Sequence, residues 1–99
     1  MLYIFDKDGT ICQSKSGQKF INTIDDQELI PGVLEKCRQL TNKGHELAIA
    51  SNQGGVAFGI LSYDEAHDIV EHAADLIEAT GFMFSPFHPD GTITAYARS

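Results

Sequence analysis

The stretch LYIFDKDGT at residues 2–10 decides how this 99-residue chain is interpreted. Its first part, Leu2–Phe5, is an uninterrupted apolar run, which is typical of a buried strand in a parallel sheet. Side chains two apart on a strand share a face but lie well apart, so Asp6 and Asp8 can serve one ligand only if the strand ends at Asp6 and the backbone curls back. Gly9 permits that curl. The stretch therefore predicts a strand followed by a tight loop with two carboxylates.

Two other interpretations of these carboxylates are a surface turn and a calcium loop. Asp-Gly is a common hairpin signal. An EF-hand loop needs an oxygen-bearing side chain at its fifth position and glycine at its sixth, and Thr10 and Ile11 meet only half of that requirement. A second polar motif favours a catalytic site over both.

This second motif is SNQGG at residues 51–55, which follows a strand-like run at Glu46–Ala50. In a parallel sheet the carboxyl ends of the strands lie at one edge, so Asp6 and Ser51 are expected to converge on one crevice. The Ser51 hydroxyl could then donate to a phosphoryl oxygen. Alone, SNQGG is an ordinary polar loop. Together the two motifs predict a phosphate-handling site.

Helix signals separate the expected strands. A first helix is expected to begin at Pro31, a favourable first helical position, and to end at Lys43-Gly44. A second begins after Ser62, whose spacing from Glu65 is that of a capping box, and is expected to end at Gly81.

A third strand is expected at Phe82–Phe84. The resulting order of strand, helix, strand, helix, strand is typical of right-handed crossovers. It predicts an α/β fold, a Rossmann-like parallel sheet of three strands with two main helices. Residues 11–30 are expected to form a flap and connection segment.

Composition narrows the classes of function. The net charge is −7, and residues 51–99 hold seven acidic groups with Arg98 as their one base, which disfavours a nucleic acid partner. The apolar run at Leu2–Phe5 is too short for a signal peptide, and we expect no membrane span. Cys12 and Cys37 make no disulfide framework, so a reducing, cytoplasmic location is expected.

With these motifs, the sequence resembles the haloacid-dehalogenase-like (HAD-like) phosphohydrolases through residues 6–10 and 51–53. The segment LIPGV at residues 29–33, together with SNQ at 51–53, is similar to the branch that holds histidinol-phosphate phosphatase and heptose-bisphosphate phosphatase. The resemblance runs from Leu2 to Pro89.

The resemblance implies a role for each matching residue. Asp6 would be the nucleophile that forms an aspartyl-phosphate, and Asp8 would be the general acid and base. Thr10, Ser51 and Asn52 would bind the substrate phosphate. The cofactor implied is Mg²⁺, held by the carboxylate of Asp6 and the backbone carbonyl of Asp8.

Two parts of the family pattern do not appear in these 99 residues. The family uses a basic residue after the third strand and acidic residues after a fourth, yet no lysine follows Lys43 and only Asp90 is acidic beyond Glu78. Residues 1–99 are therefore expected to be a single partial domain, an incomplete HAD-like core without a large cap and an amino-terminal portion of a phosphatase. Its strand at Leu2–Phe5 would be an open edge for a second copy or a complementary C-terminal chain.

The function expected from the resemblance is magnesium-dependent hydrolysis of a phosphomonoester, with a sugar bisphosphate or histidinol phosphate as substrate. The alternative is a catalytically inactive HAD-like fragment that binds phosphate or a protein partner.

Overall fold

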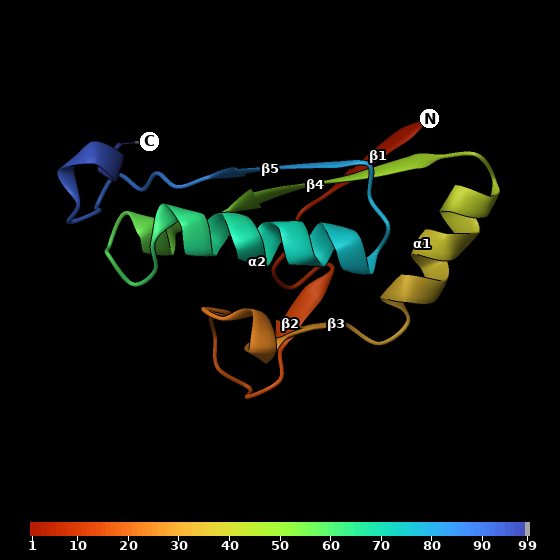
Figure 1. The fold of residues 1–99 in the computed structure, drawn as a ribbon, viewed down its shortest axis with the longest axis horizontal. Coiled ribbons are helices and arrows are strands. Elements are labelled where there is room, and N and C mark those ends of the chain that lie inside the picture. The colour runs from red at the N-terminus through yellow and green to blue at the C-terminus, as the bar shows by residue number, and fades with distance from the viewer. Residues whose placement is uncertain (99) are drawn as a thin grey trace.

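A computed structural model describes residues 1–98, and at its centre lies a parallel sheet with the strand order β1–β4–β5 (Figure 1). These strands are β1 (Leu2–Phe5), β4 (Glu46–Asn52) and β5 (Gly81–Ser85). Two helices connect them, α1 (Val33–Asn42) and α2 (Tyr63–Leu76). The predicted α/β class, with three parallel strands and two main helices, is confirmed.

Both helices lie on one side of the sheet. The crossovers step in the same direction, from β1 to β4 and from β4 to β5, so two right-handed connections place α1 and α2 on the same face. On that face Leu47 and Ile49 of β4 are buried, and they belong to the same core cluster as Ile69 and Val70 of α2. Figure 1 shows α2 running along this face of the sheet.

A second, antiparallel pair of strands lies on the far side of α2 from the main sheet (Figure 1). It consists of β2 (Cys12–Ser14) and β3 (Gln27–Leu29), which are joined through the short 3₁₀ helix η1 (Ile24–Asp26). The sequence analysis expected no strands in residues 11–30. The role of this segment as a flap stays a prediction.

The expected start of the first helix at Pro31 is wrong, because α1 begins at Val33. The Val33 amide donates to the Ile30 carbonyl at 3.1 Å, so Pro31 and Gly32 are the central residues of a β-turn. Gly32 has φ 89° and ψ −13°. A right-handed helix does not permit this positive φ, whereas the third residue of a type II β-turn requires it.

The second helix begins as predicted and ends earlier. Ser62 and Glu65 form both bonds of the capping box. However, α2 ends at Leu76, and Glu78 takes the left-handed conformation with φ 58°. Gly81 is the first residue of β5 and does not end the helix. The Ala79 amide closes the turn on the Ala74 carbonyl at 2.9 Å.

The expectation that Leu2–Phe5 is buried on both faces is also wrong. Tyr3 and Phe5 pack against the core, whereas Leu2 and Ile4 are exposed on the other face. The strand is apolar on both faces, but helices of the described residues cover only one of them.

Two further 3₁₀ segments are η2 (Gly54–Val56) after β4 and η3 (Thr94–Tyr96) after β5. They are tied together where the Ile93 amide donates to the Ala57 carbonyl at 2.8 Å. Within residues 1–98, no helix combines the length and apolar character needed to cross a membrane.

The stability of this fold is expected to fall at alkaline pH through Cys12, which is fully buried. Burial raises the pKa of the Cys12 thiol from 9.0 to about 11, although the charge of Lys7 opposes this shift in part. When the pKa of an acid is higher in the folded state than in the unfolded state, its contribution to folding stability is fully present at pH values below the unfolded pKa. This contribution, on the order of 3 kcal/mol, is lost between about pH 9 and about pH 11.

Urea denaturation at about pH 8 and about pH 10.5 measures this loss, and Cys12→Ala should remove most of it. Cys37→Ala is the comparison variant, because burial also raises the pKa of the Cys37 thiol, and it should remove a smaller part of the loss. A Cys12→Ala variant that keeps the full alkaline loss would contradict the assignment.

Candidate active site

A hollow of about 380 Å³ opens at the carboxyl end of the main sheet. It is lined by Asp6, which follows β1, by Ser51 and Asn52 at the end of β4, and by β5 residues Met83, Phe84 and Ser85, with Ala50 beside them. The structure thus brings together the first carboxylate and the second polar motif, as the sequence predicted. Ser51 and Asn52 lie within β4, which is two residues longer than the expected strand.

The loop after β1 reverses the backbone in the way that the two-carboxylate motif requires. The Lys7 carbonyl accepts bonds from the Ile11 and Cys12 amides, both at 2.9 Å, and a longer one of 3.3 Å from Thr10. Gly9 has φ 79°, and its amide donates to the Cys12 carbonyl at 3.0 Å. This reversal turns Asp8 back toward β4.

The two carboxylates have different surroundings. Asp6 accepts one bond, from the Lys7 amide to Oδ1 at 2.9 Å, and it borders the hollow. Asp8 accepts a bond at each oxygen, from Lys7 Nζ at 2.6 Å and from Gln53 Nε2 at 3.4 Å. Asp6 is therefore the carboxylate that is placed to meet a ligand in the hollow. Asp8 does not line the hollow and is connected to it through Gln53, which also bonds Ser51.

Gln53 connects the two motifs. Its Nε2 donates to Ser51 Oγ at 2.9 Å as well as to Asp8. Because Ser51 Oγ accepts this bond, its own hydroxyl hydrogen is left to donate toward the hollow. Gln53 is buried, and the sequence analysis assigned no role to it beyond its place in the SNQ motif.

Lys7 is fully buried, which the sequence analysis missed. Its Nζ donates to Asp8 Oδ1 and, at 2.8 Å, to Gln27 Oε1 of β3. A buried ammonium group needs such partners, because removal from water is costly. A lysine between two aspartates looks like a surface residue in the sequence, and only the reversal of the loop takes it inside.

The polar network continues from Gln27 to α2. Gln27 Nε2 donates to the Ile69 carbonyl at 3.0 Å and lies 2.9 Å from Nδ1 of His72. An amide nitrogen only donates, so with this amide orientation Nδ1 of His72 is the acceptor. The network joins β3, the loop after β1 and α2 through the buried side chains of Lys7 and Gln27.

Thr10 is not brought to the hollow. Thr10 is exposed and does not line the cavity. Its backbone N–H donates a hydrogen bond to the Lys7 carbonyl, which makes Thr10 a part of the loop. Its expected role in phosphate binding stays a prediction, as do the roles of the other site residues.

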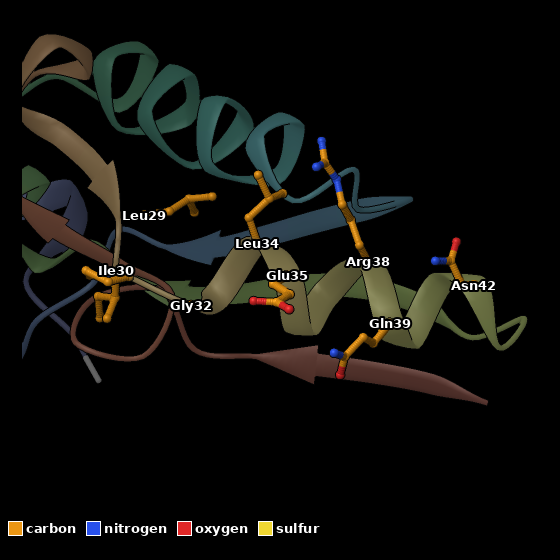
Figure 2. Close-up of a pocket in the computed structure, with 9 residues that line it drawn as sticks. Leu29, Ile30, Gly32, Leu34, Glu35, Arg38, Gln39 and Asn42 are labelled. Carbon is orange, nitrogen blue, oxygen red and sulfur yellow. The ribbon is translucent and has the colours of Figure 1, made fainter.

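A larger hollow, of about 580 Å³, runs along α1 and shares no residue with the one at Asp6. Figure 2 shows Leu34 and Arg38 pointing from α1 toward one side of this hollow. Glu35 and Gln39 of the same helix also line it. It contains neither carboxylate of the first motif, so its size does not make it the candidate active site.

The residues at Asp6 are suited to a hard cation. Carboxylate oxygens are preferred ligands of Mg²⁺, and Asp6 borders the hollow with an oxygen outside its bond to the Lys7 amide. The carboxylate of Asp8 is engaged by Lys7 and Gln53. Asp6 is therefore placed to hold a cation through its side chain, whereas the ligand expected from Asp8 is its backbone carbonyl.

A second group of possible ligands, His67, Asp68 and Glu71, lies on α2, with one ligand atom of each within 4.8 Å of the others. Asp68 and Glu71 are exposed. Carboxylates on a solvated helix face commonly cluster without an ion, so we assign no metal to this group.

Residues 1–95 match the polynucleotide kinase 3 phosphatase family. The chain belongs to this family of HAD-like phosphatases. The resemblance inferred from residues 6–10 and 51–53 is thereby confirmed. The family is named after a phosphatase of polynucleotides. For this chain, the expectation that no nucleic acid is bound stays a prediction.

Two curated relatives are D-glycero-beta-D-manno-heptose-1,7-bisphosphate 7-phosphatases. The protein from Yersinia pestis is 29% identical and that from Photorhabdus laumondii 32% identical, and each alignment covers 95% of this chain and 51% of the relative. The chain therefore spans about half the length of these relatives.

Solved structures agree with this relationship. The D,D-heptose 1,7-bisphosphate phosphatase from B. bronchiseptica, complexed with magnesium and phosphate, has a TM-score of 0.74 at 25% identity and matches over 90% of this chain and 51% of its own. The corresponding enzyme from Burkholderia thailandensis, at 23% identity and a TM-score of 0.58, shows the shared fold.

The buried lysine provides a test of the site's architecture. Lys7→Met keeps the apolar stem of the side chain and removes Nζ, which leaves Gln27 Oε1 buried without its donor. We expect the free energy of unfolding to fall by about 2 kcal/mol. Lys36→Met, on the exposed side of α1, is the control and should change it by less than about 0.5 kcal/mol. Urea denaturation of both variants measures the difference, and an unchanged Lys7→Met protein would mean that desolvation cancels the ion pair.

Proposed function

We propose that this chain carries the nucleophile and the phosphate-binding strand end of a magnesium-dependent phosphomonoester hydrolase. The observation that supports the proposal most strongly is the hollow in which Asp6 meets Ser51 and Asn52 at the carboxyl end of the sheet. The proposed substrate is a small phosphorylated metabolite. A sugar bisphosphate is favoured by the names of the relatives, with histidinol phosphate as the second choice.

In the proposed mechanism, a carboxylate oxygen of Asp6 attacks the substrate phosphorus and forms an aspartyl-phosphate. The bond to the leaving oxygen breaks, and Asp8 provides the proton that this oxygen takes up. Water then attacks the phosphorus of the intermediate and gives its proton to Asp8. The bond between phosphorus and the Asp6 oxygen breaks, so that phosphate leaves and the Asp6 carboxylate is restored.

The geometry of the chain's own residues supports this division of roles. Asp6 borders the hollow, while the carboxylate of Asp8 is held by Lys7 and by Gln53, which also bonds Ser51 of the hollow. Ser51 can donate to a phosphoryl oxygen because its hydroxyl is the acceptor in the bond from Gln53, which leaves its O–H hydrogen free. Asn52 borders the same hollow and would provide a further donor.

Magnesium, when bound, would offset the repulsion between the Asp6 carboxylate and the phosphate. The carboxylate of Asp6 and the backbone carbonyl of Asp8 are its proposed ligands from this chain. The structure of the B. bronchiseptica relative, complexed with magnesium and phosphate, supports this choice of cofactor. A cytoplasmic location remains part of the proposal, supported by the free thiols of Cys12 and Cys37.

One observation favours the alternative, an inactive fragment that binds phosphate or a protein partner. The residues that line the hollow include no lysine or arginine. A missing electrostatic contact commonly costs about 10²–10³ in rate, so we expect the 99 residues alone to be a poor phosphatase. Phosphoryl transfer to the chain distinguishes the two proposals better than turnover does.

The test is to incubate the chain with magnesium and excess aryl phosphate, quench it with acid and measure the intact mass. We expect a fraction of the chain to gain one phosphoryl group, located at Asp6 by peptide mapping. Asp6→Asn should abolish this gain, because an amide is a poor nucleophile at phosphorus. Asp90→Asn, which changes an exposed acid in the loop after β5, should retain it. A phosphorylated Asp6→Asn protein would refute Asp6 as the nucleophile, and an unmodified wild-type chain would favour the inactive fragment.

A further inference from the structure

The direction of each hydrogen bond between Lys7 and α2 is fixed by the chemistry of the two end groups. The Lys7 ammonium group can only donate, and the Ile69 carbonyl can only accept. Gln27 lies between them, so its Oε1 faces Lys7 Nζ at 2.8 Å and its Nε2 faces the Ile69 oxygen at 3.0 Å. A flipped amide would oppose two donors at one end and two acceptors at the other. The amide of Gln27 therefore has a single orientation.

The same reasoning sets the tautomer of His72. Its Nδ1 lies 2.9 Å from Gln27 Nε2, which is a donor in this orientation. Nδ1 therefore carries no hydrogen, and the ring hydrogen of neutral His72 is on Nε2. Gln27 is buried, and its oxygen and both of its amide hydrogens have partners. The Gln27 side chain is thus held at both of its polar ends.

Asp8 lies at the other end of this chain of bonds, and its two oxygens are not equivalent. Oδ1 accepts a short, charge-assisted bond of 2.6 Å from Lys7 Nζ. Among residues 1–98, Oδ2 has one longer bond, of 3.4 Å from Gln53 Nε2, and Gln53 also bonds Ser51 of the hollow. A protonated Asp8 keeps Oδ1 as an acceptor for Lys7, so its hydrogen is on Oδ2, the oxygen connected to the hollow.

Asp8 needs support from the protein interior to keep this orientation. Its side chain is 49% exposed, whereas that of Lys7 is fully buried. A lysine ammonium group is a rotatable charge on a flexible stem, and a single acceptor does not fix its direction. The second acceptor, Gln27 Oε1, supplies that direction. Without it, the buried ammonium group would have lost one of its two partners and would turn toward other oxygens.

We infer that Gln27 is a positioning residue for proton transfer by Asp8. Gln27 holds Lys7 Nζ, Lys7 occupies Oδ1 of Asp8, and the Oδ2–H bond breaks as its proton passes to the leaving oxygen. His72 supports Gln27 in this orientation. The inference rests on the proposed function, because it concerns the general acid of that mechanism. The hydrogen bonds that support it are independent of catalysis.

The first measurement is the rate at which the chain gains a phosphoryl group, followed by intact mass, from phenyl phosphate and from dinitrophenyl phosphate. Phenolate is a poor leaving group that needs a proton, whereas dinitrophenolate leaves as the anion. Gln27→Met keeps the length of the side chain and removes its polar groups. We expect it to slow transfer from phenyl phosphate at least about tenfold and from dinitrophenyl phosphate less than about twofold. Gln13→Met, at an exposed glutamine of β2 outside the network, is the matched control and should slow neither.

The second measurement needs no reaction. NMR detects a scalar coupling across the hydrogen bond between Lys7 Nζ and the carboxyl carbon of Asp8. We expect this coupling in the wild-type chain and in Gln13→Met, and its loss in Gln27→Met. If circular dichroism shows that Gln27→Met is unfolded, His72→Leu replaces it and should weaken the coupling. His72→Asn, whose Oδ1 can accept in place of Nδ1, should restore it.

Two results would overturn the inference: slowing that is not selective for phenyl phosphate, or a coupling between Lys7 and Asp8 that persists in the folded Gln27→Met protein. In the His72 variants, equal couplings in His72→Leu and wild type would do the same. A wild-type chain that gains no phosphoryl group from either ester would count against the proposed function instead. The coupling alone then decides whether Gln27 positions Asp8.

Discussion

The reversal of the backbone between Asp6 and Cys12 is the constraint on which the rest of the structure depends. The Lys7 carbonyl binds the amides of Ile11 and Cys12, and the left-handed Gly9 lets the chain return. This geometry leaves Asp6 at the end of β1, turns Asp8 toward Gln53 and directs the Lys7 side chain inward. One local turn therefore separates two neighbouring carboxylates into different environments.

Burying Lys7 has consequences beyond the loop. Its ammonium group must be paired, and the partners come from Asp8 and from Gln27 of β3. Gln27 in turn binds Ile69 and His72 of α2, so the antiparallel pair β2–β3 is held against the helix by polar as well as apolar contacts. The position of the candidate general acid thus depends on residues from three parts of the chain.

The same topology explains why the sheet has one covered and one bare face. Two right-handed crossovers in the same direction place α1 and α2 together, and the apolar side chains on the opposite face remain exposed. The candidate site lies where the bare face meets the carboxyl end of the strands.

The sequence by itself determined the order of the three parallel strands and two helices, the α2 capping box and the convergence of Asp6 with Ser51, because these follow from local patterns and from the geometry of parallel strands. It did not predict the antiparallel pair β2–β3. It could not show that Pro31-Gly32 forms a turn rather than a helix start, since proline favours both. Nor could it show that Lys7 is buried, or that Gln27 and Gln53 hold the network. Those were decided by tertiary structure, because the partners of Lys7 and of Gln53 lie up to 45 positions apart in the chain and meet only after folding.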